Sequence, residues 1–205
     1  MPENTDTQVR AKVWLRPEQV DALRSACYEV GVDYLQQRNE AIIALMYDTG
    51  VRVGELVALD VDHLRDGNSA LYLPTAIQKD YPTDSSPPPA TLELASDVSR
   101  LLSSYLTNRW KDSDALFPSR SAARITTQGV RDLVEKVAVE AGVRPYQLDG
   151  SRGEPEDVSP HALRHSVAYR MMNDEDGNTL YDVRNRLRHR SITTTEQVYD
   201  HILRR

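Results

Sequence analysis

The chain has 205 residues, of which 40% are hydrophobic, enough for one compact domain with its own core. No apolar run reaches the roughly 18 residues of a membrane span, and residues 1–10 are polar, so we expect neither a transmembrane helix nor a signal peptide. The single cysteine, Cys27, excludes an internal disulfide and is typical of a reducing cytoplasm. Val20, Leu23 and Val30 share its helical spacing, which favours a buried structural thiol over a nucleophile.

The net charge is −6 at pH 7, whereas proteins that bind nucleic acids usually have a basic surface. The charge is spread unevenly, because residues 159–205 carry more arginines than acidic residues and residues 1–158 carry an excess of acid. Four of the histidines also lie in that C-terminal stretch: His161, His165, His189 and His201. Simple solubility explains the acidity of the rest of the chain.

Apolar periodicity and turn residues predict the elements of the first part of the chain. Pro17 suits the first turn of a helix over 16–30. A second helix is expected over 34–48, and Gly50 suits the left-handed position that ends such a helix. A short helix over 53–59 follows.

The segment 61–94 is strand-like, and helical patterns return after it. Three short runs around turns at Asp66-Gly67 and a proline run predict strands, at 61–64, 70–73 and 91–94. Later helices are predicted at 96–110, 127–141, 160–172, 179–188 and 193–203. Ser159 and Pro160 suit the cap and first position of one of them. The expected fold is therefore mainly α with one small antiparallel β-sheet, an α+β domain.

The first candidate for chemistry lies in 49–56, which reads TGVRVGEL. It places Arg52 directly after a tight turn, at the start of a short helix. Helix N-termini and arginines both attract phosphate. The alternative is a surface arginine that pairs with a carboxylate such as Glu55, and Arg52 taken alone favours that alternative.

A second candidate is the HALRH sequence at 161–165. His161 and Arg164 are three residues apart and share a helix face, where they could grip a phosphate and move a proton. A zinc site at His161 and His165 lacks a third ligand, and Arg164 would repel the cation. His165 is better explained as a packed or capping histidine.

The third and most informative stretch is 187–201, LRHRSITTTEQVYDH. His189 ends one helix, a Ser/Thr run caps the next, and Tyr199 follows about two turns in. A lone helical tyrosine is usually a core residue. A tyrosine among several basic groups can instead be a nucleophile, because these groups stabilise the phenolate and the charge that develops on phosphorus.

Together these motifs resemble the tyrosine recombinase (phage integrase) family. That family shows an arginine in a Thr-Gly-x-Arg-x-x-Glu-Leu context, then His-x-x-Arg-His at a helix start. A Leu-Gly-His motif follows, and after it come Ser/Thr-rich residues and the nucleophilic tyrosine. The order and spacing agree over residues 15–203, and three ordered motifs are far more specific than any one of them. The resemblance implies the catalytic-domain fold of the family.

The family also uses a lysine in a β-hairpin between the first arginine and the His-x-x-Arg motif. Lys79 matches by position, because it follows a strand-like segment and is the only lysine between Lys12 and Lys111. The alternative is a solvated loop lysine. If the resemblance holds for Lys79, its ammonium protonates the leaving 5′-oxygen of the DNA.

The resemblance implies an enzyme that cuts and rejoins DNA. Tyr199 would attack a phosphodiester and form a 3′-phosphotyrosyl link, which conserves the bond energy. Arg52 and Arg164 would clamp the non-bridging oxygens. His161 would assist proton transfer at the tyrosine, and His189 would hydrogen-bond a phosphoryl oxygen. We expect no metal or other cofactor, because these cationic and donor groups do the work often given to Mg²⁺.

Some features depart from the family pattern. Arg188 stands where the family usually has glycine before the histidine, so a positive φ there would be strained. Residues 147–158 resemble an inserted acidic loop. Residues 1–14 are expected to be a disordered arm and 15–205 the catalytic domain. We expect no separate N-terminal core-binding domain, which most members carry.

The expected partner is double-stranded DNA, on which the protein would assemble as an oligomer in the cytoplasm. No membrane and no small-molecule substrate are expected. One alternative is a catalytically silent DNA-binding remnant that regulates recombination sites. A type IB topoisomerase shares the chemistry, but the motifs fit recombinases better. A helical scaffold with no DNA role is the alternative that the net charge of −6 suggests.

Overall fold

The structure is a computed structural model that describes residues 13–78, 87–147 and 149–199. Its α-helices are α1 (Pro17–Ala26), α2 (Asp33–Thr49), α3 (Val53–Ala58), α4 (Ser96–Asn108), α5 (Thr127–Glu140), α6 (Pro160–Asn173), α7 (Leu180–Leu187) and α8 (Ile192–Tyr199). Four short 3-10 turns are η1 (Val61–His63), η2 (Asp66–Asn68), η3 (Thr75–Ile77) and η4 (Pro155–Asp157). No helix of the described residues is long and apolar enough to cross a membrane.

The strands form two small antiparallel sheets. One has the order β2-β3-β4, from Leu64–Arg65, Ala70–Leu73 and Ala90–Glu93. The other pairs β1 (Val13–Trp14) with β5 (Tyr146–Gln147). The prediction of a mainly helical domain with a small antiparallel sheet is confirmed. The second sheet was not expected, because two-residue strands are too short to show a period of two.

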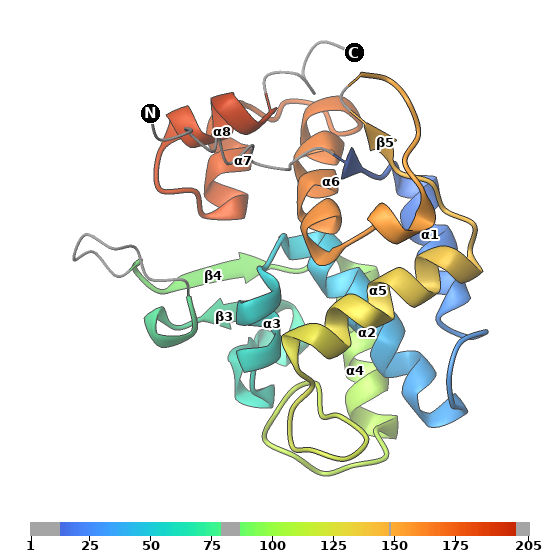
Figure 1. The fold of residues 1–205 in the computed structure, drawn as a ribbon. Helices are drawn as coiled ribbons and strands as arrows, with labels where there is room; N and C mark the ends of the chain where they lie inside the picture. Colours follow the sequence, from blue (N-terminus) through green and yellow to red (C-terminus); the bar gives the residue numbers. More distant parts are fainter. Residues whose placement is uncertain (1–12, 79–86, 148, 200–205) are drawn as a thin grey trace, which may run out of the picture.

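Helix α2 lies at the centre of the molecule, and α1, α4 and α6 pack around it (Figure 1). Its residues Ile42, Ile43 and Leu45 are fully buried in the main apolar cluster. A smaller cluster lies between α6, α7 and α8 and includes Trp14 and Leu187. The C-terminal helices therefore rest on their own patch of core, next to the end of α2.

Local signals placed most helix boundaries correctly. Gly50 ends α2 with φ 65°, in the left-handed conformation, and its N–H donates to the carbonyl of Met46 at 2.9 Å. Ser159 caps α6, because its Oγ accepts a hydrogen bond from the Ala162 N–H, and Pro160 is the first helical residue. Cys27 is fully buried, as expected of a structural thiol.

Two local expectations differ from the structure. The strand predicted over 61–64 is wrong for its first three residues, which form η1 because His63 Nδ1 accepts the Asp60 N–H at 3.0 Å. Val13–Trp14, expected within a disordered arm, form β1, and residues 1–12 lie outside the described residues. The helix predicted over 193–203 is present as α8, and residues 200–203 lie outside the described residues.

Candidate functional site

Arg52 lies at the junction of α2 and α3, two residues after the left-handed Gly50. Its backbone N–H donates to Glu55 Oε2 at 2.7 Å, and its Nη1 donates to Glu55 Oε1 at 2.9 Å. The Arg52 side chain is 25% exposed, whereas that of Glu55 is 1% exposed. The sequence offered a carboxylate partner or a phosphate site as alternatives for Arg52. The structure shows the carboxylate pair, with the Arg52 side chain partly exposed beside it.

Arg164 is buried at the meeting point of three helices. Its Nη1 donates to the carbonyl of Gly50 at the end of α2, and its Nη2 donates to the carbonyl of Leu187 at the end of α7. Carbonyls at helix C-termini lack partners within their own helix and attract cations. Arg164 therefore ties the ends of α2 and α7 to α6, and the guanidinium is held rigidly.

His161 and His165 lie one turn apart near the start of α6. Their ring centroids are 4.3 Å apart in an edge-to-face arrangement, with His161 exposed and His165 buried. The ring of His165 also meets the ring of Tyr199 edge-on at 5.3 Å. The prediction that His165 is a packed histidine is confirmed by its burial.

Tyr199 and His189 stack on each other at the turn between α7 and α8. Their ring centroids are 5.8 Å apart, with an angle of 8° between the planes. His189 Nδ1 lies 3.0 Å from Thr195 Oγ1, one turn before Tyr199 on α8. The Tyr199 side chain is 1% exposed. The fold thus brings the tyrosine of α8 against histidines from α6 and the α7–α8 turn.

Burial and the arginines shift the pKa values of this cluster. Burial, then Arg164, lowers the pKa of His189 to about 3, and partial desolvation of the His161 ring, then the same arginine, lowers the pKa of His161. Burial raises the pKa of Tyr199 to about 12, although Arg164 and Arg52 oppose that rise. Both histidines are therefore neutral at pH 7, and the phenol keeps its proton until a base removes it.

Arg164 keeps its charge despite its burial. Burial, then the neighbouring Arg52, lowers the pKa of Arg164 to about 9, which is still well above neutral pH. Two guanidiniums this close repel each other, so an anion that binds between them relieves the repulsion. The electrostatics therefore favour a phosphate at Arg52 and Arg164.

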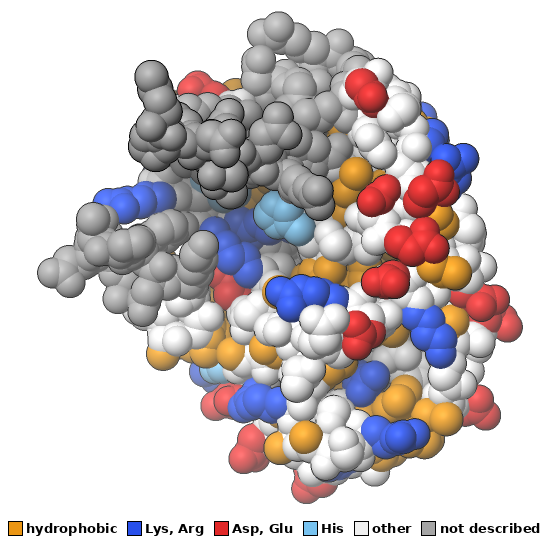
Figure 2. Space-filling view, in the orientation of Figure 1, with side chains coloured by type: hydrophobic (Ala, Val, Ile, Leu, Met, Phe, Trp, Pro, Cys, Tyr) orange, Lys and Arg blue, Asp and Glu red, His pale blue; other side chains and the backbone are white. Residues whose placement is uncertain are grey.

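Two cavities flank these residues. One, of about 370 Å³, is lined by Arg52, Arg131, His161 and Arg164 with residues of the α6 start. The other, of about 360 Å³, lies between residues 87–90 and the end of α7, where Arg184 and residues 188–190 line it. No described carboxylate lines either cavity. In Figure 2 some of the Lys or Arg side chains lie beside a histidine side chain near the middle of this face, and several acidic side chains lie to their right.

Two further residues belong to this site that the motifs alone did not assign to it. Arg131 of α5 lines the first cavity, and among the described residues it makes no ion pair or hydrogen bond. No sequence spacing connects α5 to His161, so nothing in the pattern could have found it. Glu55 pairs with Arg188 as well as Arg52, at 2.7 Å from Nη2 to Oε2. Lys79 lies outside the described residues.

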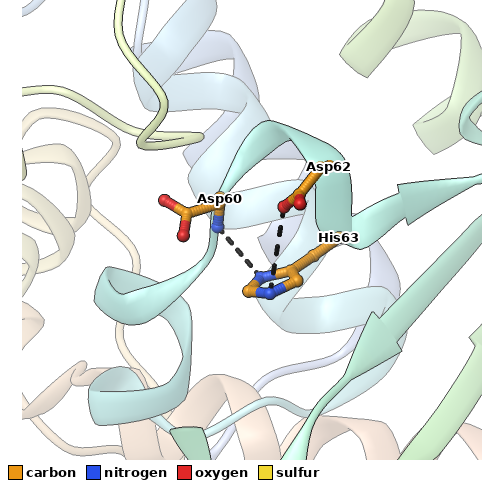
Figure 3. Close-up of side chains that lie close together, drawn as sticks. All are labelled: Asp60, Asp62 and His63. Carbon is orange, nitrogen blue, oxygen red and sulfur yellow. Dashed lines mark hydrogen bonds and ion pairs between the residues drawn. The ribbon is translucent and has the colours of Figure 1, made fainter.

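One group of potential metal ligands lies away from this site. Asp60, Asp62 and His63 offer ligand atoms within 4.8 Å of one another, the only such group of three among the described residues. Figure 3 shows the His63 ring between the other two residues, with Nδ1 taken by the Asp60 N–H. The Asp60 carboxylate is paired with Arg124. The contacts of these three residues are therefore those of a turn, and the Asp60 carboxylate is already neutralised by Arg124.

Sequence comparisons find related proteins. The phage integrase family model matches residues 13–205. Tyrosine recombinase XerC of Bifidobacterium longum (strain DJO10A) is 32% identical over 204 residues, covering 98% of this chain and 51% of the relative. Tyrosine recombinase XerD of Oceanobacillus iheyensis is 31% identical over 170 residues, covering 82% and 51%. The chain thus spans about half the length of the curated relatives it matches.

Solved structures show the same fold. A crystal structure of XerA recombinase superposes with a TM-score of 0.68 at 24% identity, covering 91% of this chain and 59% of that one. The Tn1549 transposon integrase in complex with transposon right end DNA gives a TM-score of 0.71 at 20% identity, covering 95% and 63%. The expected catalytic-domain fold is confirmed by these likenesses.

Proposed function

The chain belongs to the phage integrase family, and from that premise we propose that it is a site-specific DNA recombinase that cleaves and rejoins strands through a 3′-phosphotyrosyl intermediate. Residues 15–205 act as its catalytic domain, and double-stranded DNA in the cytoplasm is its substrate. The protein assembles as an oligomer on that DNA.

The convergence of Arg52, Arg164, His189 and Tyr199 carries this proposal. These residues come from four separate elements, yet the two arginines are close enough to both His189 and Tyr199 to shift their pKa values. Burying a charged group costs free energy unless the charge is paired. A tyrosine that only packs in the core would not need arginines beside it. A phosphodiester held between the arginines completes the charge balance of the site.

The proposed reaction begins with the phenol of Tyr199. Its oxygen attacks phosphorus as its proton passes to a neutral histidine, for which His161 is the exposed candidate. The 5′-oxygen leaves and takes a proton, a role we assign to Lys79. The phosphodiester becomes a phosphotyrosyl ester, so attack by a 5′-hydroxyl reverses the step without an energy source. Because the Tyr199 side chain is 1% exposed, DNA docking must shift α8 enough to uncover the hydroxyl.

The remaining groups stabilise the phosphorane. Arg52 and Arg164 bind its equatorial oxygens, for which bidentate guanidiniums are better suited than ammonium groups. His189 contributes a donor: when its Nδ1 accepts from the Thr195 hydroxyl, the proton of the neutral ring lies on Nε2. No step in this scheme requires a metal ion.

A suicide substrate tests the proposal. A pool of nicked duplexes with randomised sequence around the nick is incubated with the protein, and adducts that survive denaturing gels are sequenced. We expect a covalent adduct with a shared sequence, which is abolished by Tyr199→Phe. Tyr181→Phe removes an exposed hydroxyl from α7 and should leave the adduct intact.

Two other outcomes lead to other functions. Unchanged DNA footprints for the wild type and Tyr199→Phe, without any adduct, would identify a catalytically silent DNA-binding regulator. Relaxation of supercoiled plasmid by a monomer would identify a topoisomerase.

A further inference from the structure

Arg188 has a backbone conformation that arginine rarely adopts. Its φ of 53° and ψ of 47° place it in the left-handed region at the end of α7, where the Cβ of an L-residue is crowded. The other described non-glycine residues with positive φ are Asp66 and Asn68, whose short polar side chains tolerate it. Glycine would fit this position without strain, so the arginine side chain must supply something that glycine cannot.

The Arg188 side chain turns inward to a buried carboxylate. Its Nη2 donates to Glu55 Oε2 at 2.7 Å, with side-chain exposures of 8% for Arg188 and 1% for Glu55. Its Nη1 donates to the carbonyl of Arg186 at 3.2 Å. The ion pair therefore joins the end of α7, where Arg188 lies, to α3, which carries Glu55.

Glu55 is thereby shared between two arginines. It accepts the Arg52 N–H and Nη1 at 2.7 and 2.9 Å, and Arg188 binds the same carboxylate from the other side. With Arg52 alone, the buried carboxylate would be neutralised by the very guanidinium that faces the first cavity. With Arg188 present, the negative charge of Glu55 is already balanced and Arg52 retains its attraction for an anion.

We propose that Arg188 is a positioning residue, a second counter-ion of Glu55, so that Glu55 does not by itself cancel the positive charge that Arg52 presents to the reacting phosphate. This rests on the proposed function for the identity of that phosphate. Among the described residues, the guanidiniums of Arg52, Arg164 and Arg188 all act on the carboxylate of Glu55, so positive charge is in excess there. The flanking residues both contact the site, because the Leu187 carbonyl accepts from Arg164 and the His189 ring stacks on Tyr199.

Glycine and lysine variants separate this role from a simple helix cap. Arg188→Gly relieves the backbone strain but removes the counter-ion, and Arg188→Asn does the same should the glycine variant fold poorly. Arg188→Lys keeps the charge. Asp66→Gly is the matched control, because Asp66 has φ 52° and is exposed, away from the cavities.

The first measurement needs no catalysis. Inorganic phosphate is titrated against protein labelled with ¹⁵N-arginine, and the Arg52 guanidinium signals are identified by their loss in Arg52→Lys. We expect the dissociation constant for phosphate to rise roughly 10-fold in Arg188→Gly, equivalent to the loss of one charge interaction. Arg188→Lys should restore most of the affinity, and Asp66→Gly should match the wild type.

The second measurement is the rate of adduct formation on the nicked duplex pool. We expect a fall of about 10-fold or more in Arg188→Gly and Arg188→Asn, with recovery in Arg188→Lys. Wild-type phosphate affinity and wild-type adduct rate in Arg188→Gly would overturn the inference. If the wild type forms no adduct but the phosphate affinities follow the expected order, the proposed function fails and the role of Arg188 stands. If no variant differs in phosphate affinity, the role of Arg188 fails whatever the adduct assay gives.

Discussion

The backbone carbonyls of Gly50 and Leu187, from segments far apart in the chain, both accept hydrogen bonds from the guanidinium of Arg164. The same two residues are in van der Waals contact, because a Cβ built on Gly50 would overlap Leu187 Cδ2 and lie 3.6 Å from Val167 Cγ2. The end of α2 and the end of α7 therefore approach as closely as a glycine allows. Arg52 and His189 follow Gly50 and Leu187, respectively, by two residues.

Gly50→Ala should separate the two helix ends and destabilise the fold. A side chain at φ 65° costs about 1 kcal/mol, and the overlap with Leu187 adds about 1–3 kcal/mol. Gly67→Ala is the matched control, since Gly67 has the same φ of 65° but no atom within 4 Å of an added Cβ. Urea unfolding should show a loss of about 1 kcal/mol for Gly67→Ala and clearly more for Gly50→Ala. Equal losses would show that the close approach is absent in solution.

Glu55→Gln should be far more damaging than loss of an exposed ion pair. It leaves Arg188, whose side chain is 8% exposed, without its counter-ion, and removal of one partner of a buried pair costs about 3–5 kcal/mol. Glu154→Gln removes the partner of Arg144 in a pair with side-chain exposures of 65% and 51%. That control should change the free energy of unfolding by roughly 0–1 kcal/mol. A small effect of Glu55→Gln would mean that the carboxylate is not buried between the two arginines.

Arg131→Ala should weaken DNA binding and reduce its salt dependence. If Arg131 contacts one phosphate from the wall of the first cavity, its removal should make the negative slope of log affinity against log salt shallower by about 0.9. Lys136→Ala removes the same charge from the same helix, but Lys136 lies among Asp132, Glu135 and Glu140. Fluorescence anisotropy with randomised duplexes should show the smaller slope for Arg131→Ala alone. The same slope in both variants would place the DNA elsewhere.

Stability should fall in mild acid because of His189. Burial, then Arg164, lowers its folded pKa to about 3, below the unfolded value of about 6.5. Between these two values the unfolded chain binds a proton that the folded state excludes, so the free energy of unfolding decreases as the pH falls from about 6.5 toward about 3. The loss by about pH 4 should be on the order of 3 kcal/mol.

Urea unfolding at several pH values, with His189→Gln beside the wild type, measures this contribution. The variant should have a flatter dependence below about pH 6.5. The ring proton signals of His189, followed by NMR, should stay constant from about pH 8 to about pH 5. A ring titration near the ordinary pKa of histidine would contradict the burial of His189 among the arginines.

Local sequence signals predicted several helix ends, because each of these ends depends on a few neighbours along the chain. Gly50 was predicted from its place after a helix, and Ser159 with Pro160 from capping preferences. The strand predicted over 61–64 is wrong for its first three residues, and part of the reason is a contact with a distant segment of the chain. A contact between Asp60 and His63 and a hydrogen bond from the Val61 N–H to the Asp114 carbonyl favour a 3-10 turn over an extended strand.

The order of the motifs identified Arg52, His161, Arg164, His189 and Tyr199 as one candidate set, and local propensity determined the helices that carry them. Only the tertiary structure decided which of these side chains lie together. It also decided that Glu55 is shared by two arginines and that Arg131 of α5 lines the same cavity. The reason is physical. Helix ends and turns depend on hydrogen bonds within a few residues, whereas burial and charge balance depend on groups that only packing brings together.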